Sequence, residues 1–174
     1  SKAWFEAVAA TYGVDAERTQ QVLEMPYQRA KRAVSVHRSK LEGKRIHLLP
    51  DSQLEIPMAR FLSEECGLGI NEIGTPFHDQ LVMRGELARL PKEVPIVEGQ
   101  DLDPALSRVR ASRPDLTVCG MGIANALESE GLRTKWSIEL VFSPVQGFDQ
   151  AGDLAGLFAK PLARQEILEV GSWS

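Results

Sequence analysis

Cysteine is scarce in this sequence, which has only Cys66 and Cys119 among its 174 residues. Two thiols do not make a disulfide framework, so we expect a reducing compartment, the cytoplasm. They are also too few to hold an iron–sulfur cluster, which takes about four thiolates. Cys66 falls near the end of an expected helix and Cys119 at the end of an expected buried strand. We therefore interpret both thiols as structural.

Histidine is nearly as rare, and the chain has only His37, His47 and His78. None of them has metal-ligand spacing with another histidine or a carboxylate, apart from the direct neighbours His78 and Asp79. Of the three histidines, only His78 is considered for a functional role. The alternative is that His78 is simply a solvated histidine in a loop. No Ser-His-Asp or Cys-His arrangement is visible. We expect no metal site and no catalytic residue in this chain.

Long apolar runs and an excess of positive charge are also missing. No apolar run approaches the ~20 residues that a membrane span needs, and the first residues lack the layout of a signal peptide. The net charge of −4 argues against a nucleic-acid binder. The 43% hydrophobic and 25% charged content is ordinary for one soluble globular domain. The one strongly basic stretch, 27–45, is interpreted as a solvated face or, alternatively, as a docking face for an acidic partner.

Apolar strands alternate with helical stripes from residue 46 onward. The expected strands cover 46–50, 70–73, 94–97 and 116–119, with a fifth extended piece at Trp136. The expected helices cover 2–12, 27–42, 54–66, 79–89 and 124–130, with others from Pro104 and after Asp149. This alternation predicts a Rossmann-like α/β fold, with a parallel sheet of about five strands, helices on both faces and helices before it. We divide the chain into an N-terminal helical segment (1–43), an α/β domain (44–170) and a tag remnant (171–174).

Three local signals refine this outline. Pro26 predicts a break or kink in the helix that follows Asp15. Ser52 and Glu55 predict a capping box, with the Ser52 hydroxyl on the amide of residue 55 and the Glu55 carboxylate on the amide of Ser52. Gly120-Met-Gly-Ile-Ala-Asn125 resembles the start of a dinucleotide fingerprint but lacks its third glycine and follows the fourth strand. We interpret it as a tight turn where the backbone approaches something flat or a neighbouring subunit.

The stretch around Trp136 carries the candidate site. Apolar residues at 136, 138, 140 and 142 alternate with Ser137 and Glu139, which predicts an extended segment. In a parallel sheet, this segment and the 120–125 loop leave the same edge, where ligands bind. Trp136 is then either an aromatic at the edge of the core or a flat wall for a flat ligand. Lys135 or Arg133 would meet a ligand carboxylate.

The same stretch carries a family resemblance. Thr134-Lys-Trp-Ser-Ile-Glu139, Gln146-Gly-Phe148 and 151–162 resemble the N subunits of the light-independent (dark-operative) protochlorophyllide reductases, which are nitrogenase-like. Upstream, the similar segments are Pro50-Asp-Ser-Gln-Leu-Glu-Ile-Pro57, Gly74-Thr-Pro76, Val97-Glu-Gly-Gln-Asp101 and Arg113-Pro-Asp-Leu-Thr-Val-Cys-Gly120. The resemblance covers most of this chain but only the last domain of the family's subunit.

The resemblance implies an oxidoreductase that reduces the C17=C18 double bond of protochlorophyllide, using ATP and ferredoxin-derived electrons. It implies an N2B2 heterotetramer with a B-type sister subunit, an L-protein dimer that binds ATP-Mg and donates electrons, and a 4Fe-4S cluster whose ligands are not in this chain. The implied substrate-binding residues are Thr134, Lys135, Trp136 and Ser137, to which we add Met121 of the glycine loop. This domain would line the tetrapyrrole pocket and scaffold the complex, whereas the fragment alone would be inactive.

Other hypotheses stay open beside this one. The nearest is a subunit of the related chlorophyllide reductase. A nucleotide-binding α/β module would use the 120–125 loop. A purely architectural domain would pair an apolar edge with the B-type sister subunit.

Overall fold

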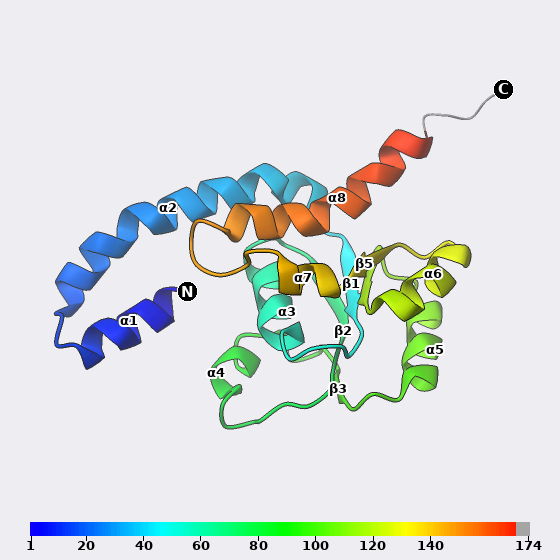
Figure 1. The fold of residues 1–174 in the computed structure, drawn as a ribbon, viewed down its shortest axis with the longest axis horizontal. Helices are drawn as coiled ribbons and strands as arrows, with labels where there is room; N and C mark the ends of the chain where they lie inside the picture. Colours follow the sequence, from blue (N-terminus) through cyan, green and yellow to red (C-terminus); the bar gives the residue numbers. More distant parts are fainter. Residues whose placement is uncertain (170–174) are drawn as a thin grey trace.

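The computed structural model describes residues 1–169, and the expected tag remnant at 171–174 lies outside the described residues. The helices are α1 (Lys2–Thr11), α2 (Ala16–Leu41), α3 (Glu55–Glu64), α4 (Arg84–Leu87), α5 (Leu102–Ser112), α6 (Met121–Ser129), α7 (Ile138–Phe142) and α8 (Ala151–Glu169). The strands are β1 (Arg45–Leu48), β2 (Gly69–Thr75), β3 (Ile96–Glu98), β4 (Leu116–Cys119) and β5 (Thr134–Trp136). Figure 1 shows how the helices surround the strands.

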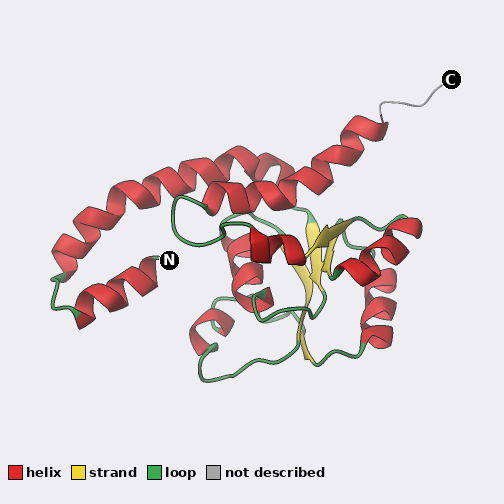
Figure 2. Cartoon of the chain, viewed as in Figure 1, coloured by secondary structure: helices red, strands yellow, loops and turns green. Residues whose placement is uncertain are grey.

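The five strands form one parallel sheet in the order β3-β2-β1-β4-β5 (Figure 2). This confirms the predicted α/β fold. Because the strand order reverses between β1 and β4, the loops that follow these two strands diverge at the carboxyl edge of the sheet. That point is where a ligand crevice is expected in such folds.

Each face of the sheet has its own apolar core. On one face, residues of α2, α3, α7 and α8 pack against Ile46, Leu48, Leu116 and Val118. On the other face, α5 and α6 pack around a smaller cluster that includes Leu49 and Cys119 from the ends of β1 and β4. Since α2 contributes to the first core, it is part of the folded unit, and the division of the chain at residue 43 stays a prediction.

Helix α2 runs without interruption through Pro26, so the predicted break is wrong. Buried residues lie on both sides of the proline, with Leu23 before it and Ala30 and Val34 after it. Burial of this stripe offsets the missing amide hydrogen bond at Pro26. Figure 1 shows α2 as a long curved helix.

Helices α2 and α8 lie side by side (Figure 1) and approach closely at Gly152. A Cβ atom built on Gly152 would lie 2.6 Å from the Cβ of Ala33, which is nearer than real side chains pack. Glycine at this position therefore permits the helix crossing.

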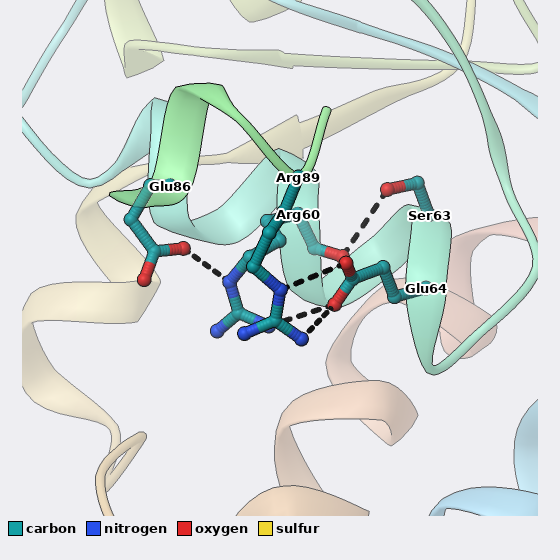
Figure 3. Close-up of polar contacts among 5 residues, drawn as sticks. All are labelled: Arg60, Ser63, Glu64, Glu86 and Arg89. Carbon is teal, nitrogen blue, oxygen red and sulfur yellow. Dashed lines mark hydrogen bonds and ion pairs between the residues drawn. The ribbon is translucent and has the colours of Figure 1, made fainter. Parts of the chain in front are cut away.

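An ion-pair network joins α3 to α4 (Figure 3). Arg60 of α3 pairs with Glu86 of α4 and also with Glu64, at 3.2 Å. Arg89, which follows α4, donates from Nε to Glu64 at 3.0 Å. Of the helix predicted at 79–89, only the short α4 is formed. The ion-pair network connects α4 to α3, which packs on the sheet.

A row of polar residues crosses the sheet under α5 and α6. Glu72, His47, Thr117 and Thr134 are neighbours on adjacent strands, and all are buried. His47 Nε2 lies 3.5 Å from Glu72, whose other oxygen accepts a 2.7 Å hydrogen bond from Arg108 Nε. Burial, with a smaller contribution from Arg108, lowers the pKa of His47, although Glu72 opposes this. The row therefore holds a histidine that the native fold keeps neutral.

We predict opposite effects for two Gly-to-Ala substitutions in helices. Gly152→Ala overpacks the α2–α8 crossing and should lower the free energy of unfolding by about 1–3 kcal/mol. Gly122→Ala in α6 meets nothing within 4 Å and should be neutral, or stabilising by about 0.4–1 kcal/mol. Urea denaturation measures both. Equal effects from the two substitutions would contradict the close crossing.

We predict that His47 makes stability depend on pH. The unfolded chain protonates this histidine near pH 6.5, whereas the native state does so only at a lower pH. The unfolded state therefore binds more protons below about pH 6.5, and stability falls as pH falls. The loss of stability between pH 7.5 and pH 5.5 should be smaller in His47→Gln than in the unsubstituted chain.

Thr117→Val is the matched control for this prediction, because it alters the same buried row without removing a titrating group. It should keep the full pH dependence. An unchanged pH dependence in His47→Gln would show that other groups cause it.

Candidate functional site

The loop after β1 is organised by the buried carboxylate of Glu55. One of its oxygens accepts from the amides of Asp51 and Ser52, at 3.1 and 2.5 Å, and from the Ser52 hydroxyl at 3.1 Å. Its other oxygen accepts from the Thr75 hydroxyl, at the end of β2, at 3.4 Å. Glu55 thus connects the carboxyl ends of β1 and β2 to the first turn of α3.

The capping-box prediction is half correct. The Glu55 carboxylate reaches the Ser52 amide as expected. The Ser52 hydroxyl accepts instead from the amide of Leu54, at 3.1 Å. The reason is that α3 begins at Glu55 with Leu54 as its N-cap, so Ser52 lies outside the first helical turn.

Asp51 spans the point where the strand order reverses. Ser137, which follows β5, donates a hydrogen bond to one Asp51 oxygen. The other Asp51 oxygen lies so close to Gly120 that a Cβ built there would be 3.0 Å away. Gly120 is the N-cap of α6, which begins at Met121, so the predicted tight turn at 120–125 is wrong and most of it is the first turn of a helix.

The position of Asp51 at the start of α6 tests the nucleotide-binding alternative. A dinucleotide-binding fold receives phosphate at a helix N-terminus beside the crevice. In this chain, the carboxylate of Asp51 lies beside Gly120 at the start of α6. A phosphate at that position would meet a like charge, so the geometry argues against the nucleotide-binding alternative.

The extended segment predicted from Trp136 to Phe142 is also wrong. Strand β5 ends at Trp136, and the Ser137 amide donates to the carbonyl of Cys119 at 3.0 Å before α7 begins at Ile138. Lys135 at the end of β5 and Glu139 in the first turn of α7 form an ion pair across the point where the strand passes into the helix. Leu140 is buried in α7, whereas Phe142 is 82% exposed.

Trp136 lies on the wall of a hollow of about 680 Å³ at the edge strand, which we call the Trp136 hollow. Its volume is in the range of pockets that bind small ligands, roughly 300–1,000 Å³. The indole is 37% exposed. The lining residues are Glu128, Gly131, Leu132, Arg133, Thr134, Lys135, Trp136, Glu139, Leu157, Lys160, Pro161 and Arg164.

The hollow brings together three of the five predicted substrate-binding residues: Thr134, Lys135 and Trp136. Ser137 is buried and bonded to Asp51, and it does not line the hollow. Met121 is 53% exposed at the start of α6 and does not line it either. Trp136 and Gly120 nevertheless share the carboxyl edge, since Trp136 pairs in register with Cys119.

Two of the predicted substrate-binding residues that line the hollow are engaged within the chain. Lys135 is only 4% exposed, and its ammonium pairs with Glu139 of α7. The Thr134 hydroxyl donates to Glu128 of α6. These contacts hold the side chains of two residues of the strand that carries Trp136.

A second hollow, of about 550 Å³, lies between α1, α2, α3 and the 145–148 loop. It contains none of the five predicted substrate-binding residues. His78 belongs to neither hollow, and its Nδ1 lies 3.0 Å from Glu98. The Trp136 hollow is therefore the candidate site.

Sequence reasoning missed Asp51 and the α8 residues of the site. Asp51 could have been found in principle, because it follows the first strand at the predicted ligand edge. Lys160 and Arg164 had no such signal, because they come from a helix far along the chain that folds back against β5.

The residues present do not fit an iron–sulfur cluster. Cys66 and Cys119 lie in different cores, and burial raises the pKa of each to about 12, so both are thiols rather than thiolate ligands. Among the described residues, no three histidine, cysteine or carboxylate side chains gather as metal ligands would. No helix of the described chain combines the length and apolar character of a membrane span.

Comparisons with known proteins follow this geometry. The sequence matches the family described as "Nitrogenase component 1 type Oxidoreductase" over residues 1–162. It is 58% identical to light-independent protochlorophyllide reductase subunit N of Halorhodospira halophila (strain DSM 244 / SL1) over 170 residues, which are 98% of this chain and 40% of the relative. It is 54% identical to the same protein of Acidiphilium rubrum, with the same coverage. The chain thus spans about two fifths of the length of these relatives.

Solved structures agree on the fold. "Nitrogenase Cp1 at pH 6.5" superposes with a TM-score of 0.71 over 94% of this chain and 37% of that chain, at 15% identity. "Nitrogenase Cp1 at pH 5" gives a TM-score of 0.66 over 85% of this chain and 36% of that chain, at 14% identity. At such identities the likeness concerns the fold alone. The subunit N resemblance found in the sequence is confirmed by the curated relatives.

We predict that both cysteines resist alkylation in the native state. At pH 8 a thiol with a pKa of about 12 is thiolate in roughly one molecule in ten thousand, against roughly a quarter at the ordinary pKa near 8.5. Iodoacetamide labelling followed by intact mass should show no modification until urea unfolds the chain, which is the control. Rapid native labelling of Cys66 or Cys119 would contradict their burial.

Proposed function

The chain belongs to the family of nitrogenase component 1 type oxidoreductases, and on that premise we propose that it is the C-terminal part of subunit N of a light-independent protochlorophyllide reductase. That enzyme reduces the C17=C18 double bond of protochlorophyllide to give chlorophyllide, in the cytoplasm and at the expense of ATP. The proposal is supported by relatives that carry this name at 53–58% identity across nearly the whole chain. The same names favour protochlorophyllide over the chlorophyllide reductase alternative.

Within that enzyme, the role we propose for this domain is to form one wall of the tetrapyrrole pocket. The observation that carries this role is the Trp136 hollow, where a part-exposed indole stands at the carboxyl edge of a parallel sheet. A flat macrocycle gains apolar burial and stacking against an indole face. Leu132, Leu157 and Pro161 add apolar lining in the same hollow.

Contacts of the residues next to Trp136 hold the proposed pocket wall rigid. Ser137 is tied to Asp51, and Asp51 belongs to the loop that Glu55 organises. Lys135, the neighbour of Trp136 in β5, is held by Glu139. Thr134, Lys135 and Ser137 therefore position Trp136, and Met121 is proposed to contact the pigment from the first turn of α6, outside the hollow.

The remaining parts of the reaction belong to other chains. The B-type sister chain completes an N2B2 heterotetramer, and an L-protein dimer with bound ATP-Mg delivers electrons derived from ferredoxin. The 4Fe-4S cluster of the complex is the one-electron carrier, and its ligands lie outside this chain. We also propose that this domain is a scaffold that pairs with the B-type chain, as the architectural hypothesis holds.

We predict that Trp136→Leu weakens binding of protochlorophyllide by about tenfold or more, because the variant loses stacking and apolar contact area. The measurement is a titration of the assembled N2B2 complex, with both chains at full length, followed by pigment absorbance and fluorescence quenching. Size-exclusion chromatography checks that the heterotetramer still forms.

Trp4→Leu is the matched control, because Trp4 is 64% exposed on α1 and does not line the Trp136 hollow. It should bind pigment as the unsubstituted complex does. Full-strength pigment binding by Trp136→Leu would remove Trp136 from the pocket.

A further inference from the structure

The second hollow, of about 550 Å³, has no part in the proposed function. It lies between α1, α2, α3 and the loop 145–148, and we call it the α1–α3 hollow. It shares no lining residue with the Trp136 hollow. Figure 1 shows α1 and the first half of α2 on the side of the molecule away from β5 and α6. The two hollows are therefore separate features of the fold.

More than half of the residues that line the α1–α3 hollow are apolar or aromatic. They include Met58 and Phe61 of α3, Tyr27 of α2, Leu154 of α8 and Phe148 of the loop. Such a surface gains free energy when apolar side chains cover it.

Several charged side chains of this hollow are already paired within the chain (Figure 3). Arg60 pairs with Glu86, and Arg89 pairs with Glu64. Small-molecule sites usually hold polar groups that converge on the ligand, whereas an apolar centre beside satisfied charges is typical of protein interfaces. The lining therefore favours a protein segment as the occupant.

Helix α1, on one wall of the hollow, is poorly packed in this chain. It has ten residues, and none of them is buried. An aromatic contact connects it to the loop, since the ring of Phe5 stacks on that of Phe148 with centroids 5.8 Å apart. Helices shorter than about 12–15 residues are marginal in water without tertiary packing. Further packing against α1 would therefore stabilise it.

Resting on the proposed function, which makes this chain the C-terminal part of a longer subunit, we infer that the N-terminal part of the same subunit N polypeptide docks into the α1–α3 hollow. The curated relatives are long enough to supply it, since this chain spans only 40% of the first of them. Residues 1–3 line the hollow. A polypeptide joined to them is tethered at the wall of the hollow, at an effective concentration that is roughly millimolar.

The docking segment presents apolar side chains. They cover the apolar centre formed by Tyr27, Phe61 and Phe148, and they give α1 the buried face that it lacks in this chain. The paired arginines and glutamates need no opposite charge from the segment. The hollow is in this way an interface within one subunit and not a second ligand pocket.

The test uses the assembled N2B2 complex, with both chains at full length and a photo-crosslinking amino acid, p-benzoylphenylalanine, in subunit N. The residue replaced is Gln146 in the loop or Lys31 on α2, because both are exposed and line the hollow from different elements. The control position is Ser35, which is exposed on α2 but outside the hollow. Denaturing electrophoresis separates the products by size, and peptide mass spectrometry locates each cross-link.

The inference predicts that irradiation at Gln146, at Lys31 or at both links this chain to peptides from the N-terminal part of the same polypeptide. The product then keeps the size of one N chain, and Ser35 gives no such link. Cross-links from both positions that stay within residues 1–174 would mean an open hollow and would overturn the inference. Products with the size of N plus B or of two N chains would also overturn it, as would the same link from Ser35.

Titration of the same labelled complexes with protochlorophyllide separates this inference from the proposed function. If the complex binds the pigment but the intrachain link is missing, only the docking is wrong. If the link forms but the complex binds no pigment, the proposed function is wrong and the docking stands.

Discussion

The buried carboxylate of Glu55 is the contact on which the candidate site depends. It accepts hydrogen bonds from the loop after β1 and from the end of β2, and so fixes where Asp51 stands. Asp51 then accepts from Ser137, the residue after Trp136. A carboxylate this deeply buried is tolerable because several donors satisfy it, and their loss would leave a buried charge without partners. The position of the indole thus rests on interactions that begin two strands away.

The strand order explains why these contacts meet. The loops after β1 and β4 diverge at the reversal point, and this chain fills the gap between them with Asp51 instead of leaving it for a phosphate. The Trp136 hollow lies instead at the edge strand β5, where residues of α8 also line it.

Much of the fold could be predicted from the sequence, because short apolar strands and helical stripes alternate at regular spacing. The failures have physical causes. Residues 138–142 fit a period of two, yet they form the helix α7, which buries Leu140 in the core beneath α8 and leaves Phe142 exposed. Pro26 was expected to break or kink a helix, but buried residues on both sides carry the helix through it without a break. The α8 side of the site could not be predicted at all, because it depends on packing between distant segments.

The most direct test of this account is a structure of the complete complex with protochlorophyllide bound. The account predicts that the macrocycle lies in van der Waals contact with the Trp136 indole, at about 3.5–4 Å. A pigment bound elsewhere, with the Trp136 hollow filled by another chain, would contradict it.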